Sequence, residues 1–206
     1  MGVAVDELVD VLSRERGLLE NLVFRLIEAR GLLATGEARF LGWAASDIES
    51  ATAAVREVEL RRATVLSDLD LGGPATMAVL VDTAVEPWSS LLDDHRVALG
   101  RLAGEVGAAL EATHELAAAG LDRVLAAGHR EELGEPDEIG DHLGARWAGS
   151  HRDDGRREPG STLQPRRTQP FAQLDDLDRE ITAAGYQAVL AATDRMALPS
   201  LVAFLA

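Results

Sequence analysis

The sequence contains no cysteine and no lysine, and only 4% of its 206 residues are aromatic. Without cysteine the chain can form no disulfide, no thiolate nucleophile and no cysteine-ligated zinc site. Runs of aromatic and β-branched residues with a period of two are also missing, so we predict no β-sheet. The abundant residues are alanine, leucine, arginine and glutamate, which are among the stronger helix formers. The composition therefore predicts an all-α protein.

Positive charge is scarce, because 20 arginines face 35 acidic residues and the net charge is −15. Nucleic-acid binding needs clustered cations that neutralise phosphates, so it is not expected. The one basic cluster, between Arg152 and Arg167, is interrupted by acids and prolines and is better explained as a solvated linker. No apolar run approaches the roughly 18 residues of a membrane helix, and the first residues lack the pattern of a signal peptide. We therefore expect a cytoplasmic protein without membrane insertion.

Apolar residues recur at three- and four-residue spacing in two adjacent segments, Asp6 to Leu33 and Phe40 to Leu66. Such spacing places apolar side chains along one face of a helix. Between the segments, Gly36 suits the left-handed backbone that often ends a helix. Helices joined by a short connection usually lie antiparallel. The first third of the chain therefore predicts a helical hairpin.

A third long helix is predicted after a break in the pattern. The Gly-Gly-Pro run at residues 72–74 cannot continue a helix, and a short helix is expected over residues 76–84. Pro87 then suits the first turn of a helix that runs to about Ala127. Together with the hairpin, this helix predicts an antiparallel, coiled-coil-like bundle.

The composition changes again at Gly128. From there to Pro170 the chain is dense in glycine, proline and charge, and it lacks a sustained period. Such a segment buries too little apolar surface to offset the entropy of ordering, so we predict a flexible linker. We expect at most one short docked turn in it, at Ile139, Leu143 and Trp147. Helical periodicity resumes after Phe171. The predicted divisions are a helical domain over 1–127, a linker over 128–170 and a C-terminal amphipathic helix over 171–206.

Motifs for catalysis and metal binding are incomplete. Glu111 and His114 have the Glu-x-x-His spacing of di-iron carboxylate bundles, but a second copy of this motif is missing. Asp68 begins a stretch similar to a calcium loop, yet position twelve of that loop is Val79 instead of glutamate. Serine-nucleophile, phosphate-loop and dinucleotide motifs are absent too. We therefore expect no enzyme activity, no cofactor and no bound metal, and we interpret the chain as an interaction protein.

Two segments resemble proteins of flagellar export. Within about residues 6–125, LSRERGLLENLVFRLIEARGLLATGEARFLGWAASDIE, REVELRRATVLSDL and PWSSLLDDHRVALGRLAGEV resemble the actinobacterial form of FlgN, the flagellar type III export chaperone. Within about residues 174–206, LDREITAAGYQAVLAATDRMALPSLVAFL resembles the C-terminal helix of FlgL, the hook–filament junction protein, and of flagellins. Asp194 departs from that pattern, since such tails usually carry a small residue there. The resemblance implies a chaperone-like body fused to a client-like helix.

The resemblance also implies a function and partners. FlgN-like chaperones bind the C-terminal disordered helices of the hook-associated proteins FlgK and FlgL before export. The expected partner is therefore such a helix, docked in cis or swapped in trans, and the flagellar export gate is a second expected partner. Both a natural gene arrangement and an engineered fusion fit the sequence.

Recognition of a helix in an apolar groove predicts which residues meet. The groove is expected on two stripes of the body: Leu19, Leu22, Leu26 and Leu33, with Leu99, Leu102, Val106 and Leu110. The client helix is expected to insert Leu177, Ile181, Ala184, Tyr186, Ala188, Val189, Leu201, Phe204 and Leu205. The alternative is an oligomeric helical-bundle scaffold, in which the last helix is an ordinary bundle member or is swapped between protomers.

Overall fold

The computed structural model describes residues 2–69, 75–132, 169–196 and 198–206, and within these ranges the regular structure is entirely helical. The predicted all-α fold is therefore confirmed. Most of the predicted linker, including the expected turn at 139–147, lies outside the described residues. The helices are α1 (Gly2–Thr35), η1 (Ala38–Phe40), α2 (Leu41–Asp68), α3 (Met77–Thr83), α4 (Trp88–Glu132), α6 (Gln169–Asp194) and α7 (Pro199–Leu205).

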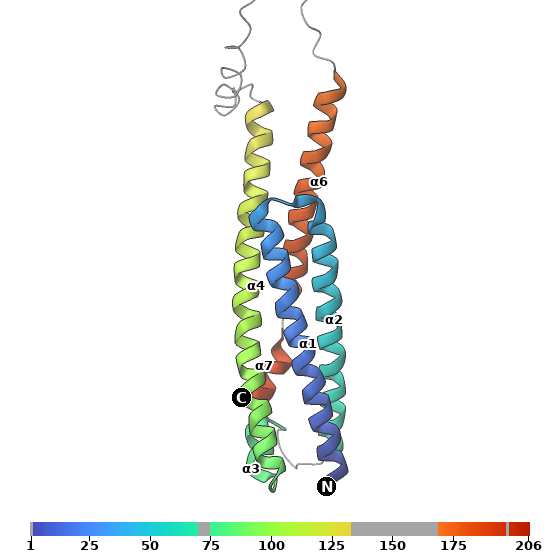
Figure 1. The fold of residues 1–206 in the computed structure, drawn as a ribbon, viewed down its shortest axis with the longest axis vertical. Coiled ribbons are helices and arrows are strands. Elements are labelled where there is room, and N and C mark those ends of the chain that lie inside the picture. The colour runs from blue at the N-terminus through green and yellow to red at the C-terminus, as the bar shows by residue number, and fades with distance from the viewer. Residues whose placement is uncertain (1, 70–74, 133–168, 197) are drawn as a thin grey trace, which may run out of the picture.

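The four long helices α1, α2, α4 and α6 lie side by side as a bundle (Figure 1). Helix α1 packs against α2 and α4, and α6 packs against the same two helices. Helices α1 and α6 therefore occupy opposite corners of the bundle, as do α2 and α4. Between α2 and α4 in the chain lies the short helix α3, which packs on α4 and α7.

The turn of the α1–α2 hairpin forms at the glycine that the sequence indicated. Gly36 has a φ of 74°, and the next residue, Glu37, donates its N–H to the Leu32 carbonyl over 3.0 Å. A residue with a side chain is strained at this φ, whereas glycine is not. The positive φ lets the chain leave α1 and, after the short η1, start α2 in the opposite direction.

The core consists of the apolar stripes that face the bundle axis. Among the residues whose burial the structure describes, twelve large side chains are almost completely buried, and they come from α1, α2, α3, α4 and α7. Burying a leucine stabilises the fold by about 1.5–3 kcal/mol before entropy is counted. The members are Leu8, Leu12, Leu19, Leu22, Leu26, Leu41, Ile48, Met77, Leu92, Leu99, Leu102 and Leu201.

The predicted single helix over 171–206 is wrong in its continuity. Helix α6 begins at Gln169 and ends at Asp194, and a separate helix α7 begins at Pro199. Leu198 has φ −115° and ψ 51°, outside the helical region. The ring of a proline disfavours helical backbone in the residue before it, so Pro199 explains the break. The predicted end of the body was also early, because α4 runs on to Glu132.

One histidine is buried in the core. His95 on α4 is 3% exposed, and its Nδ1 has no hydrogen-bond partner among the described residues. Burial lowers the pKa of His95 below its ordinary value of 6.5; the charge of Arg16 lowers it further, whereas Asp94 raises it. The folded protein therefore binds a proton at His95 more weakly than the unfolded chain does.

We expect the neutral ring of His95 to make stability depend on pH. Its contribution is present above pH 6.5 and is lost as the pH falls through the lowered pKa of the folded state. In His95→Leu, the free energy of unfolding should fall less between about pH 7 and pH 5 than in the parent chain. Urea unfolding, followed by circular dichroism at each pH, measures the free energy of unfolding of both proteins. Equal losses in the two proteins would contradict the prediction.

Candidate functional site: the tail interface

Helices α6 and α7 together cover one side of the body formed by α1 to α4. We call their contacts with η1, α2, α3 and α4 the tail interface. Helix α6 lies between α2 and α4 and contacts η1, and α7 continues toward α3 and α4. Figure 1 shows this order along the bundle, with α7 nearer the end where α3 lies. Three groups of contacts fix the tail, at the hairpin turn, at the break between α6 and α7, and at α7.

At the hairpin turn, two glycines allow backbones to approach closely. A Cβ placed on Gly120 of α4 would lie 2.0 Å from Cε1 of Tyr186, so the ring rests directly on this glycine. A Cβ placed on Gly185 of α6 would lie 3.0 Å from the Ala38 carbonyl oxygen and 3.1 Å from the Leu41 Cβ. Any larger residue at Gly120 therefore has to displace Tyr186.

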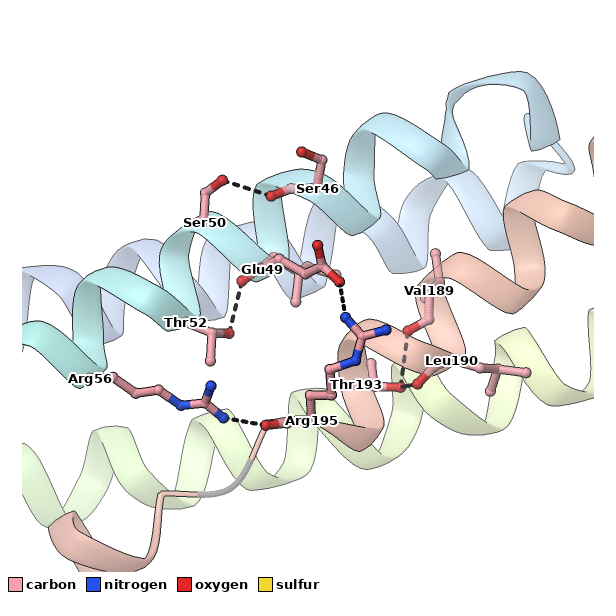
Figure 2. Close-up of polar contacts among 10 residues, drawn as sticks. Ser46, Glu49, Ser50, Thr52, Arg56, Val189, Leu190, Thr193 and Arg195 are labelled. Carbon is pink, nitrogen blue, oxygen red and sulfur yellow. Dashed lines mark hydrogen bonds and ion pairs between the residues drawn. The ribbon is translucent and has the colours of Figure 1, made fainter.

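At the break, polar side chains of α2 hold the end of α6, as Figure 2 shows. Arg56 donates a hydrogen bond to the main-chain carbonyl of Arg195, the residue after the last of α6. The guanidinium of Arg195 pairs with Glu49 at 2.7 Å. The last carbonyls of a helix lack partners within the helix, and they favour a nearby positive charge. Arg56 supplies both the donor and the charge.

Helix α4 contributes to the same end from its own side. The Nδ1 of the half-buried His114 lies 3.2 Å from the Thr193 hydroxyl and 3.5 Å from a carboxylate oxygen of Asp194. In the sequence, His114 stands out only as part of an incomplete Glu-x-x-His motif. The structure places it against the tail instead.

At α7, an aromatic ring covers a buried ion pair. The Cζ of Arg62 lies 4.3 Å from the centre of the Phe204 ring, and Arg62 also donates to a carboxylate oxygen of Glu15. Arg62 is 3% exposed and Glu15 is fully buried. Burial raises the pKa of Glu15, and this effect outweighs the attraction and hydrogen bond of Arg62, which lower it.

Of the two stripes predicted to line the groove, one lies on a helix that packs against α6 and the other does not. Both predicted stripes face the interior: every member is buried except Leu110, which is partly buried. Only the stripe on α4 belongs to a helix that packs against α6, because the second helix beside α6 is α2 and not α1. The α1 residues Leu19, Leu22, Leu26 and Leu33 serve the shared core instead.

The predicted anchors of the tail divide by their position along α6 and α7. Tyr186, Val189, Leu201 and Phe204 are buried, and Ala188 and Leu205 are partly buried. Ala192, Thr193 and Met196 are buried as well. They follow Val189 at spacings of three, four and seven residues, although none of them was predicted as an anchor.

Three predicted anchors are wrong. Leu177 is 51% exposed, Ile181 is 49% exposed, and Ala184 is exposed as well. The reason is the length of the hairpin, since Gly185 already lies beside its turn. Figure 1 shows that the earlier part of α6 extends past this turn together with α4 alone.

Comparison with protein-family models, with curated proteins and with solved structures found no match.

Among the described residues, no group of three or more histidine, aspartate or glutamate side chains could hold a metal ion. The stretch Leu177–Leu205, searched within those same residues, is long and apolar enough by length and composition to cross a membrane. The expectation that no apolar run approaches the length of a membrane helix is therefore wrong. In the structure the stretch is divided between α6 and α7.

The contact between Gly120 and Tyr186 is open to a direct test. In Gly120→Ala the new methyl group collides with the Tyr186 ring, and overpacking of this kind costs about 1–3 kcal/mol. We expect faster amide hydrogen exchange in α6 after Tyr186. The matched control is Gly107→Ala on the same helix, where a Cβ meets nothing within 4 Å. That variant should stabilise the chain by about 0.5–1 kcal/mol. Similar effects of both substitutions would contradict the contact.

Proposed function

We propose that the body of this protein is a flagellar type III secretion chaperone, and that α6 and α7 stand for its client. In this proposal α1 to α4 bind and shield the C-terminal helix of a hook-associated protein similar to FlgL or FlgK before export. The client segment is joined to the body through residues 133–168. The FlgN-like and FlgL-like motifs support this assignment, because each lies in the part of the chain that carries the corresponding role.

One observation carries the proposal: from Tyr186 onward, five large apolar side chains of the tail are buried in the structure. Tyr186, Val189, Met196, Leu201 and Phe204 are each at most 6% exposed. Such side chains on a free terminal helix would promote aggregation or premature assembly. Covering them is what a chaperone for this kind of client has to do.

The polar contacts of the tail interface suit a reversible complex. The Glu49–Arg195 pair is solvent-exposed, and exposed ion pairs contribute at most about 1 kcal/mol each. Ordering the tail also consumes part of the gain from burial. Covalent attachment compensates, because joining two segments in one chain can raise their effective concentration to about the millimolar range. A contact of micromolar affinity therefore stays occupied within one chain.

A second candidate is an oligomeric scaffold, which a different surface favours. Beyond the hairpin turn, α4 and α6 expose Leu125 at 57%, Leu177 at 51% and Ile181 at 49%. Exposed apolar side chains on adjoining helices are typical of surfaces that contact another chain. In this alternative the tail is a permanent member of the bundle, or it is exchanged between two copies.

Cleavage of the chain between body and tail distinguishes the two candidates. A protease site placed within residues 133–168 allows the folded protein to be cut without altering the tail interface. As a chaperone complex, the cut protein should release residues 169–206 on dilution through the micromolar range, and the body should stay helical. An added peptide of residues 169–206 should compete with the released tail. Fluorescence anisotropy of a labelled tail and circular dichroism of the body measure the two effects.

The uncut chain with the same insertion is the control, and it should show neither release nor competition. If the body unfolds when the tail leaves, α6 is an ordinary bundle member and the chaperone proposal fails. A mass that doubles with concentration in light scattering would instead support exchange between copies.

A further inference from the structure

Arg62 differs from the other residues of the tail interface because it is a charge without access to water. Among the arginines whose burial the structure describes, it is the only buried one. It lies on α2, bonds to Glu15 on α1 and faces Phe204 on α7. Three helices, two of the body and one of the tail, therefore meet at a single guanidinium.

The body holds this guanidinium in place from one side. Glu15 accepts a hydrogen bond from Nη1 of Arg62 through one carboxylate oxygen, and its other oxygen has no partner among the described residues. Glu59, three residues before Arg62 on α2, is 9% exposed and also leaves one oxygen without a partner. Carboxylates therefore accompany the cation within the body, and α7 covers it from the tail.

The tail covers it with an aromatic ring. Removing an ion pair from water is costly, and the attraction within the pair repays this cost only in part. The face of an aromatic ring is negative and attracts a cation, most strongly when both are shielded from water. An aliphatic side chain of similar size would exclude the water without supplying this attraction. Phe204 is 5% exposed, so it supplies both.

The other buried side chains of the tail do not need to be aromatic in order to attract a cation. Tyr186 rests on Gly120, where the available space decides what fits, and Val189 and Leu201 join the apolar core. Aliphatic side chains of suitable shape can fill an apolar core in many combinations. Only the position of Phe204 sets the tail against a buried charge.

We propose that Arg62, positioned by Glu15, is the specificity-determining residue of the tail interface, and that it selects an aromatic side chain at the position of Phe204. The proposal rests on the proposed function in one respect, namely that a client helix takes the place of the tail. The preferred client then has a helix, a break and a short second helix with an aromatic residue three positions after a buried leucine. In this chain the buried leucine is Leu201 and the aromatic residue is Phe204.

Amide hydrogen exchange of the intact chain tests the contact between Arg62 and Phe204. The amides of Val202 and Ala206 donate to the carbonyls of Leu198 and Val202, so their exchange reports on α7. In Phe204→Leu their exchange should be about 10-fold faster than in the parent, whereas Phe204→Tyr should stay within about 3-fold. In the background Glu15→Leu/Arg62→Met, Phe204→Leu should change the rates by no more than about 3-fold. Val202→Ala, at a position 63% exposed on the same helix, is the control and should have little effect.

A second measurement leaves the shape of the side chain at position 204 and the Arg62–Glu15 pair unchanged. Phenylalanine with one, two or three ring fluorines at position 204 keeps its size but weakens the negative face of the ring. The exchange rates should rise with each fluorine if the ring attracts Arg62. This series decides the matter even if the double variant fails to fold. Rates that do not depend on fluorine, or a Phe204→Leu effect of equal size in both backgrounds, would overturn the proposal.

The result also separates this proposal from the proposed function. A preference for an aromatic residue in the intact chain, together with a cut tail that no added peptide replaces, would support the role of Arg62 and overturn the chaperone function. Competition by added peptides regardless of an aromatic residue at this position would support the chaperone function and overturn the role of Arg62.

Discussion

The bundle depends on the filling of the space between α2 and α4. These two helices occupy opposite corners, and each needs a neighbour on both of its inner sides to keep its apolar stripe from water. Helix α1 supplies one neighbour, and α6, continued by α7, supplies the other. A body made of α1, α2 and α4 alone would leave an open, apolar side. The tail binds this side because it covers the apolar surface, and another helix of matching shape would bind there for the same reason.

Apolar burial alone does not fix the position of the tail along this open side. The close contacts at glycine and the contacts of charged side chains fix it. The ring of Tyr186 on Gly120 sets the level of α6 relative to α4. Arg56 then meets the carbonyl of Arg195 just where α6 ends, and Arg62 meets Phe204 after the break. The tail is thus positioned as two helices at a defined separation. A continuous helix would carry its later residues away from these partners.

The sequence predicts the body better than the tail because the body follows local rules. Periodic apolar residues and Gly36 are sufficient to place the hairpin, and the structure agrees with its ends to within a few residues. Proline at 199 was an equally local indication of the break, yet the apolar character on both sides obscured it. The exposure of Leu177 and Ile181 is different, since it depends on how far the hairpin reaches along α6. The contribution of α2 was missed because Glu49, Arg56 and Arg62 are charged, and charged residues on a helix usually face solvent.

The most direct test of the account is a disulfide between the hairpin turn and α6. The chain has no cysteine, so Leu41→Cys/Gly185→Cys introduces one unique pair. A Cβ at position 185 lies 3.1 Å from that of residue 41, close to the spacing of about 3.5–4.5 Å in disulfides. Mild oxidation should give a bond within one chain, visible as a faster band on a non-reducing gel, whereas a Leu60→Cys/Gly185→Cys pair should give none. Failure of the first pair to form this bond, or its formation only between two chains, would contradict the placement of the tail on its own body.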